Sequence, residues 1–143
     1  MKPTNVSPCI VTEKIDECRK FYTKHFNAIV TFDCGWFINI SLNTSDRDVT
    51  SIQFMSPRTP DQPTYPGQGI TFNIDVPSAD EFHKKLVTNN GLPAQLPLDD
   101  HPWGDRGFAV IDPAGVTLYI YHLIEPADDF KQFFNEPEIT SNP

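Results

Sequence analysis

The stretch that decides the fold is residues 102–121, which read PWGDRGFAVIDPAGVTLYIY. Its centre, Asp112-Pro113-Ala114-Gly115, has the composition of a tight turn, because Asp hydrogen-bonds its own backbone, Pro presets φ and Gly supplies a positive φ. Side chains alternate along a strand, so the residues flanking the turn divide between two faces. One face is apolar and predicts a core: Phe108, Val110, Leu118 and Ile120. The other is small, aromatic and hydroxyl-bearing, which suits the wall of a cavity: Gly107, Ala109, Ile111, Thr117, Tyr119 and Tyr121.

The composition indicates one folded domain and narrows its partners. A chain of 143 residues with 38% hydrophobic residues can bury a core. The net charge of -8 and the pI of about 4.7 argue against nucleic acid, whose phosphates select basic surfaces. No apolar run is long enough to span a membrane, and residues 1–5 lead into no signal-peptide pattern. Cys9, Cys18 and Cys34 have no metal-site spacing, so we expect reduced thiols in a cytoplasmic protein.

The first half of the chain predicts a strand, a helix and three further strands. Residues 6–12 suit a strand that starts near Pro8. Residues 14–26 carry apolar side chains at helical spacing, with charges between them. Three short strand-like runs follow, separated by Gly35 and by a polar turn at 43–46: residues 28–33, 36–42 and 49–55. Residues 56–67 contain four prolines and therefore read as a linker.

The second half repeats this order. Residues 69–76 alternate between apolar and polar side chains and predict a strand. Residues 78–90 predict a helix, because Ser78 and Glu81 form a capping box and Gly91 suits a positive-φ cap. Residues 94–97 and a loop then lead into the hairpin. In the tail, residues 124–134 place three phenylalanines at helical spacing, as expected of a short docked helix.

The order strand-helix-strand-strand-strand therefore occurs twice. We predict an α+β fold made of two paired βαβββ modules within a single domain, residues 1–143. The first module is residues 6–55 and the second is residues 68–122. Residues 56–67 link them, and residues 123–143 form a tail. Each helix should cover the apolar face of its own module, and the opposite faces should curve around a shared cleft.

A doubled βαβββ unit that ends in a Trp-Gly-x-Arg…Asp-Pro-x-Gly hairpin resembles the vicinal oxygen chelate superfamily. That superfamily holds glyoxalase I, extradiol dioxygenases, fosfomycin-resistance enzymes and bleomycin-resistance proteins. Phe21-Tyr22 in the first helix and Gly35-Trp36-Phe37 at the third strand support the resemblance, and Asp112-Pro113-Ala114-Gly115 is its most specific element. The resemblance implies a small molecule bound in the cleft and, as in many members, a homodimer.

The metal-dependent members of this superfamily place one ligand on the first and last strand of each half. Matching those positions here gives Ser7, Gln53, Gly69 and Tyr119. Members carry His, Gln or Glu at these points, because a divalent metal needs imidazole or carboxylate donors that converge on one centre. Only Gln53 suits that role, and a shift by one residue brings in no ligand. The resemblance therefore implies the metal-free, bleomycin-resistance-like branch, with no metal and no cofactor.

Two residues near the hairpin have both a binding and a structural interpretation. Trp103 can lie over a ring or cation of a ligand, where stacking or cation–π attraction gives ~0.5–2 kcal/mol, or it can plug the end of the sheet. Arg106 can form a bidentate pair with an anionic group of a ligand, or it can hold the loop through Asp99, Asp100 or Asp105.

The four histidines do not suggest a metal pair, because no two share a ligand spacing. His25 and His83 lie on the two predicted helices, where we expect solvated or helix-end side chains. His101 lies in the predicted loop before Pro102 and could reach the mouth of the cleft. His122 alternates with Leu118 and Ile120, which points it away from the cleft.

The predicted binding wall is neutral and carries amides, hydroxyls and aromatic rings, a set that suits a planar or amphipathic molecule. Its ligand-binding residues are Phe37, Asn39, Gln53, Met55, Thr71, Asn73, Trp103, Arg106, Tyr119 and Tyr121. No residue is assigned a catalytic role, because no carboxylate in this set is placed for acid–base work and Cys9 lacks a nearby base. We therefore predict a metal-independent protein that sequesters an aromatic or amphipathic ligand.

Two other readings remain open. The chain can be a metal-dependent lyase or dioxygenase of the same superfamily with displaced ligands such as Gln53, Tyr119 and His101. It can also be a dimeric scaffold whose cleft is filled by its own side chains.

Overall fold

The computed structural model describes residues 1–43 and 50–135. Among these, residues 1–72 with 110–118 form one compact unit, and residues 73–109 with the described chain from Tyr119 onward form a second. Residues 44–46 of the predicted turn, Val49 of a predicted strand and residues 136–143 of the tail lie outside the described part.

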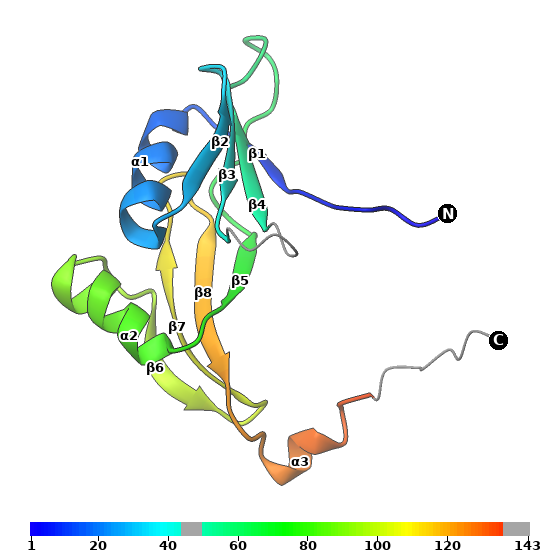
Figure 1. The fold of residues 1–143 in the computed structure, drawn as a ribbon, viewed down its shortest axis with the longest axis vertical. Helices are drawn as coiled ribbons and strands as arrows, with labels where there is room; N and C mark the ends of the chain where they lie inside the picture. Colours follow the sequence, from blue (N-terminus) through cyan, green and yellow to red (C-terminus); the bar gives the residue numbers. More distant parts are fainter. Residues whose placement is uncertain (44–49, 136–143) are drawn as a thin grey trace. The chain divides into compact units, whose positions relative to one another are not determined.

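The first half forms a four-stranded sheet with one helix (Figure 1). Its elements are β1 (Cys9–Val11), α1 (Ile15–Phe26), β2 (Ile29–Asp33), β3 (Phe37–Ser41) and β4 (Ser51–Met55). The strand order is β1-β4-β3-β2, in which β1 and β4 are parallel and the other neighbours antiparallel. Strand β1 begins at Cys9, later than predicted, since the carbonyl of Pro8 accepts from Gln53 N–H at 2.9 Å but its ring nitrogen has no hydrogen to donate.

The second half forms another four-stranded sheet, in the order β5-β8-β7-β6. Its elements are β5 (Thr71–Asp75), α2 (Ala79–His83), η1 (Lys84–Asn89), β6 (Leu96–His101), β7 (Asp105–Ile111), β8 (Thr117–Leu123) and, in the tail, α3 (Asp128–Lys131). The βαβββ order therefore occurs twice, and the predicted α+β fold class is confirmed. No helix of the described residues is long and apolar enough to cross a membrane.

Two elements of the second half differ from the sequence prediction. The helix begins as predicted, with Ser78 Oγ accepting the Glu81 N–H at 3.2 Å, but it continues as the π-helical segment η1. There Asn90 N–H bonds to the carbonyl of Lys85, five residues back, and six residues are too few for hydrophobic spacing to separate this turn from an α turn. Strand β6 runs to His101, so His101 ends a strand and does not lie in a loop.

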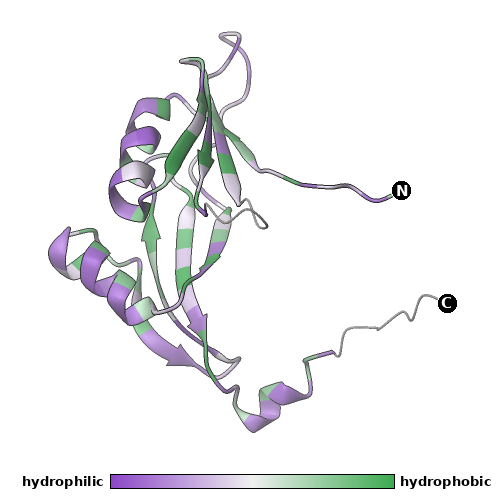
Figure 2. Cartoon of the chain, viewed as in Figure 1, coloured by the Kyte–Doolittle hydropathy of each residue, from purple (hydrophilic) through white to green (hydrophobic). Residues whose placement is uncertain are grey.

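Helix α1 is held to the first sheet by one apolar stripe. Its buried residues are Ile15, Cys18, Phe21, Tyr22 and His25. Figure 2 shows the rest of α1 largely hydrophilic, as expected of an amphipathic helix with one face in the core. Of the two expectations for His25, a solvated or a helix-end side chain, the second agrees with the structure: His25 lies in the last helical turn, but only 6% of it is exposed, with its ring 4.8 Å from that of Phe21. All three cysteines are free.

The hairpin turn is organised by the buried carboxylate of Asp112. Its Oδ1 accepts the backbone N–H groups of Ala114 and Val116, both at 2.9 Å, and Gly115 has a φ of +97°. The other oxygen, Oδ2, accepts the hydroxyl of Tyr22 at 2.6 Å. A turn closed by its own side chain is thus tied to helix α1 by a hydrogen bond between two buried groups.

Burial governs the ionisation of this cluster. It raises the pKa of the Asp112 carboxyl, while the hydrogen bonds from Tyr22 and from the turn backbone act in the opposite direction. Burial and the nearby Asp112 charge raise the pKa of Tyr22 well above its usual value. The same two causes raise the pKa of the Cys18 thiol to about 12. Tyr22 and Cys18 therefore stay protonated, and Tyr22 always has a hydrogen to donate.

Replacing Tyr22→Phe should lower the free energy of unfolding by about 1–3 kcal/mol, because a buried acceptor loses one of its partners. Urea denaturation followed by circular dichroism measures this. Tyr65→Phe is the matched control, because the Tyr65 hydroxyl meets the Gly115 carbonyl only at 3.4 Å and is half-buried. Equal losses in the two variants would contradict the role given to Tyr22.

The deficit of Tyr22→Phe should shrink as the pH falls. Since burial raises the folded-state pKa of Asp112, its ionised form costs the native state stability, and that cost disappears as pH falls through the folded pKa. Removing the Tyr22 hydroxyl costs the ionised form more than the neutral carboxyl, because a hydrogen bond to a charged acceptor is the stronger one. Denaturation of both proteins at about pH 7 and about pH 4, near the ordinary Asp pKa, measures the change. A pH-independent deficit is the contrary result.

Candidate functional site

The most organised polar cluster of the second unit surrounds Asp105, the first residue of β7. Its carboxylate accepts three side-chain donors: Trp103 Nε1 at 2.7 Å, Tyr119 OH at 2.5 Å and His101 Nδ1 at 2.8 Å. The side chain of Asp105 is 11% exposed and that of His101 is 14% exposed. One carboxylate thus orients three aromatic side chains from β6, the β6–β7 turn and β8.

The rings of this cluster form a continuous aromatic surface. The imidazole of His101 stacks on the indole of Trp103, with centroids 4.6 Å apart and planes 1° apart. The His101 ring lies 6.1 Å from that of Tyr119, which stacks on Tyr121 at 5.5 Å. Trp103 is 47% exposed, so this surface is open to solvent at its Trp103 end.

The tyrosine rings lie across β7 because the residue beneath them is Gly107. A Cβ there would stand 2.9 Å from Cζ of Tyr119 and 2.8 Å from Cβ of Tyr121. Only a residue without a side chain leaves room for the ring of Tyr119 and the Cβ of Tyr121 at these distances. The prediction that Tyr119 and Tyr121 share a face with Gly107 agrees with these distances.

Arg106 points elsewhere and is engaged within the protein. Its Nε and Nη2 bond to the Asp80 carboxylate at 3.0 and 2.9 Å, and its Nη1 bonds to Asp100 at 3.0 Å. These two ion pairs raise the pKa of Arg106 and lower that of Asp80. The structural interpretation of Arg106 thus holds for Asp100, with Asp80 as a partner that the sequence did not suggest.

In the first unit, four predicted binding residues are cross-strand neighbours. Phe37 pairs with Met55, and Asn39 pairs with Gln53, across β3 and β4. All four are half-buried, and Gln53 Nε2 donates to Asn39 Oδ1 at 3.2 Å. They form a mixed amide and apolar patch. Thr71 and Asn73 are both exposed on β5, and the shared cleft that would join these sets stays a prediction.

The positions matched to metal ligands hold no set of metal donors. Ser7 Oγ lies 3.1 Å from Ser51 Oγ, Gln53 is bonded to Asn39, and Tyr119 donates to Asp105. Gly69 has no side chain. Across residues 1–43 and 50–135, no group of three or more His, Cys, Asp or Glu side chains is arranged to hold a metal ion. These donors therefore do not fit a divalent metal.

The other two histidines are also structural. His83, expected to be solvated or at a helix end, is the last residue of α2 and is half-buried, with its ring edge-on to Phe108 at 5.1 Å. His122 Nδ1 accepts the backbone N–H of Ala79 at 2.9 Å. It thereby satisfies a free N–H at the start of α2.

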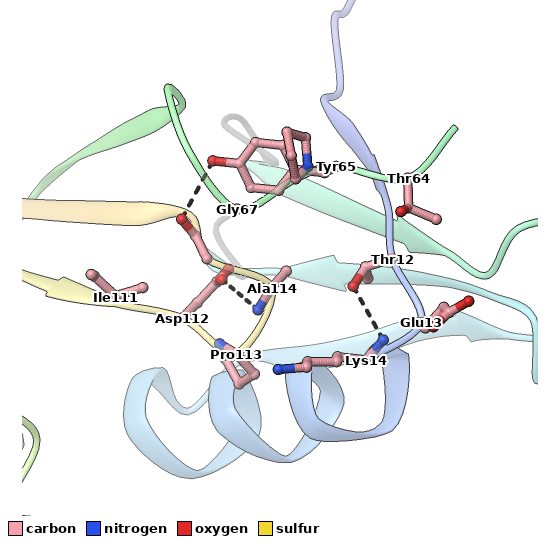
Figure 3. A pocket seen from close by; sticks show the side chains of 12 residues that line it. Thr12, Glu13, Lys14, Thr64, Tyr65, Gly67, Ile111, Asp112, Pro113 and Ala114 are labelled. Atoms are coloured by element: carbon pink, nitrogen blue, oxygen red, sulfur yellow. Dashed lines mark hydrogen bonds between the residues drawn. The ribbon is translucent and has the colours of Figure 1, made fainter. Parts of the chain in front are cut away.

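A pocket of about 480 Å³ lies beside the hairpin turn in the first unit and includes none of the ten predicted binding residues. Figure 3 shows the turn on one side, the β1–α1 connection on another and Tyr65 of the linker above. Several of its polar groups already pair with each other, such as Thr12 Oγ1 with Lys14 N–H at 3.1 Å. We assign this pocket to the packing of the linker on the turn.

Sequence reasoning missed Asp105 as the centre of the cluster. A signal was present, because alternation from Gly107 places Asp105 on the same face as Tyr119 and Tyr121. The residue was interpreted only as a partner for Arg106. His101 was underestimated because it was predicted to lie in a loop, whereas it is the last residue of β6.

The fold and the chain match one family. The model of the Glyoxalase/Bleomycin resistance protein/Dioxygenase superfamily matches residues 6–120. A glyoxalase/bleomycin resistance protein/dioxygenase from Nocardioides is similar in structure, with a TM-score of 0.67 and 17% identity over 87% of this chain and 86% of that chain.

Two further solved structures are similar. The lactoylglutathione lyase from Agrobacterium tumefaciens has a TM-score of 0.61 and 15% identity over 85% of this chain and 95% of that chain. TioX from Micromonospora sp. ML1 has a TM-score of 0.62 and 16% identity over 85% of this chain and 100% of that chain. At such identities the likeness concerns the fold. No curated protein is similar enough in sequence to count as a match.

Replacing Gly107→Ala should displace the rings of Tyr119 and Tyr121 and lower the free energy of unfolding by about 1–3 kcal/mol, the usual cost of overpacking. Chemical denaturation and the tyrosine ring resonances in NMR measure the two effects. Gly91→Ala is the control for the ring resonances only, because a Cβ at Gly91 meets nothing within 4 Å, whereas its φ of +73° makes alanine there destabilising in its own right. Unshifted Tyr119 and Tyr121 resonances in Gly107→Ala would refute the prediction.

Proposed function

Since the chain belongs to the Glyoxalase/Bleomycin resistance protein/Dioxygenase superfamily, we propose that it is a metal-independent protein that sequesters a small aromatic or amphipathic molecule. The observation that carries the proposal is the aromatic surface of Trp103, His101, Tyr119 and Tyr121, whose Trp103 end is 47% exposed. Exposed rings held in fixed orientations bind flat ligands at little entropic cost.

Metal independence is supported by the chemistry of the matched ligand positions. Seryl and phenolic hydroxyls, one amide and a glycine offer weak donors, and the hydroxyls and the amide already hydrogen-bond to other side chains. Burial, followed by the Asp105 hydrogen bond and charge, raises the pKa of Tyr119, so its phenolate, the form that would bind a metal, is disfavoured.

The ligand is expected to be neutral or cationic. The acidic side chains near the aromatic surface are Asp105 and Asp75, whose charges add to burial in raising the pKa of Tyr121. Arg106 is engaged by two carboxylates and offers little to an anion. The patch of Phe37, Asn39, Gln53 and Met55 is proposed as a second binding face, and Thr71 and Asn73 stay predicted binding residues. We also propose that the protein is cytoplasmic and forms a homodimer.

Fluorescence of Trp103 tests the binding function. In a Trp36→Phe variant Trp103 is the sole tryptophan, and its emission should change in a saturable way with benzyl alcohol or benzyltrimethylammonium. Cyclohexylmethanol is the matched non-aromatic control and should have a much smaller effect. If no compound of an aromatic fragment set alters the emission, the surface is not a ligand site.

Thermal shift with Ni²⁺, Zn²⁺, Mn²⁺ and Fe²⁺, together with elemental analysis of the purified protein, tests metal independence. We expect no stoichiometric metal and no shift, whereas a bound metal stabilises a fold by ~2.7 kcal/mol at a hundredfold excess over Kd. One metal per chain with a clear shift would favour the metal-dependent enzyme.

A further inference from the structure

We propose that Nε2 of His101, left without a hydrogen in the neutral ring because Nδ1 donates to the Asp105 carboxylate, is the hydrogen-bond acceptor that selects aromatic ligands carrying an O–H or N–H donor. The inference rests on the proposed binding function and deepens it, because it names the chemical class of ligand that the aromatic surface prefers. A phenol or an indole is such a ligand, whereas the corresponding methyl ether or N-methyl compound is not.

The contact with Asp105 sets the tautomer of His101. A carboxylate oxygen has only lone pairs to offer, so the ring nitrogen that faces it carries the hydrogen. Nδ1 lies 2.8 Å from Asp105 Oδ1. Tyr119 supplies its own hydrogen to the same oxygen and cannot replace that of Nδ1. In the neutral imidazole the hydrogen is therefore on Nδ1, and Nε2 is left with a lone pair.

The neighbours of His101 also fix the orientation of its imidazole ring. His101 is fixed on three sides: by Asp105 at Nδ1, by Tyr119 OH at 3.0 Å from the same nitrogen, and by the parallel indole of Trp103. Trp103 is held in turn by its own bond to Asp105. The direction of Nε2 is thus set before any ligand arrives, which lowers the entropic cost of a hydrogen bond to it.

Nε2 of His101 is available to a ligand. No hydrogen bond to Nε2 comes from the described residues, 1–43 and 50–135, since both polar contacts of the ring use Nδ1. Among the same residues no fully buried side-chain nitrogen or oxygen lacks a partner, so an unpartnered Nε2 is not fully buried, and the His101 side chain is 14% exposed. Nε2 is therefore an acceptor at the edge of the aromatic surface, and no group in this part of the chain donates a hydrogen bond to it.

A ligand bound to the neighbouring tyrosine rings can reach Nε2 of His101. A flat ligand on the Tyr119 and Tyr121 rings lies next to the imidazole, whose centroid is 6.1 Å from that of Tyr119. An O–H or N–H on the edge of such a ligand meets an acceptor there. A methyl group in its place leaves Nε2 without a partner and displaces the water that served it.

The tautomer can be tested in the unmodified protein. Nitrogen-15 NMR of the imidazole rings, read in the neutral form of each ring, should find His101 protonated at Nδ1 and free at Nε2. His122 is an internal contrast, because its Nδ1 accepts the Ala79 N–H and its hydrogen must therefore lie on Nε2. A His101 protonated at Nε2 in neutral form would overturn the proposal without any ligand.

The ligand preference is tested with naphthol and its methyl ether, methoxynaphthalene, by calorimetric titration. We expect naphthol to bind about three- to tenfold more tightly, the ratio that one net hydrogen bond provides. In His101→Asn, whose amide can still donate to Asp105 but has no group at Nε2, the ratio of the two affinities should fall to about one, whatever the loss of the imidazole ring does to the binding of both probes. His83→Asn is the matched control and should keep the preference.

The outcomes separate the two proposals. Equal binding of both probes to the wild type, or an unchanged preference in His101→Asn, overturns the role of Nε2 and leaves the binding function intact. Binding of neither probe counts against the binding function itself and removes the basis of the inference, whatever the tautomer. A preference that disappears only in His101→Asn supports both.

Discussion

The hydrogen bond between Tyr22 and the buried carboxylate of Asp112 is the contact on which the first unit depends most. One oxygen of Asp112 closes the hairpin turn by accepting two backbone N–H groups, and the other accepts the Tyr22 hydroxyl from helix α1. Local turn geometry and the packing of a distant helix thus share one side chain. Because that side chain is buried, loss of either partner leaves a polar group unsatisfied, and the arrangement admits few alternatives.

Asp105 repeats this device in the second unit, to a different end. The carboxylate of Asp105 is also nearly buried and accepts hydrogen bonds from neutral side chains. Here, however, the donors are aromatic rings with exposed edges or faces. Asp112 fixes a backbone turn and is closed to ligands. Asp105 fixes an indole, an imidazole and a phenol, and leaves Trp103 47% exposed with Nε2 of His101 unpaired within the described chain. Order at this cluster therefore produces a surface on which a ligand can bind.

Sequence reasoning was accurate where a local rule has no competitor, as at the Ser78–Glu81 cap and the Asp112-Pro113-Ala114-Gly115 turn. It was inaccurate where the outcome depends on distant partners. His25 was expected to be solvated or at a helix end; it does lie at the end of α1, but only 6% of it is exposed, a degree of burial that its place in the helix did not indicate. Arg106 had three candidate acids nearby in sequence, and it pairs with only one of them, because Asp80, across the unit on α2, supplies the better-placed carboxylate.

The sequence by itself determined the doubled strand and helix order, the turn, the core face of the hairpin and the identity of the aromatic residues opposite it. These follow from alternation and turn chemistry, which act over a few residues. Only the tertiary structure decided which carboxylate accepts hydrogen bonds from which ring, which nitrogen of His101 faces Asp105, and which acids pair with Arg106. Hydrogen bonds between side chains far apart in the chain depend on tenths of an ångström, and no periodic pattern encodes such distances.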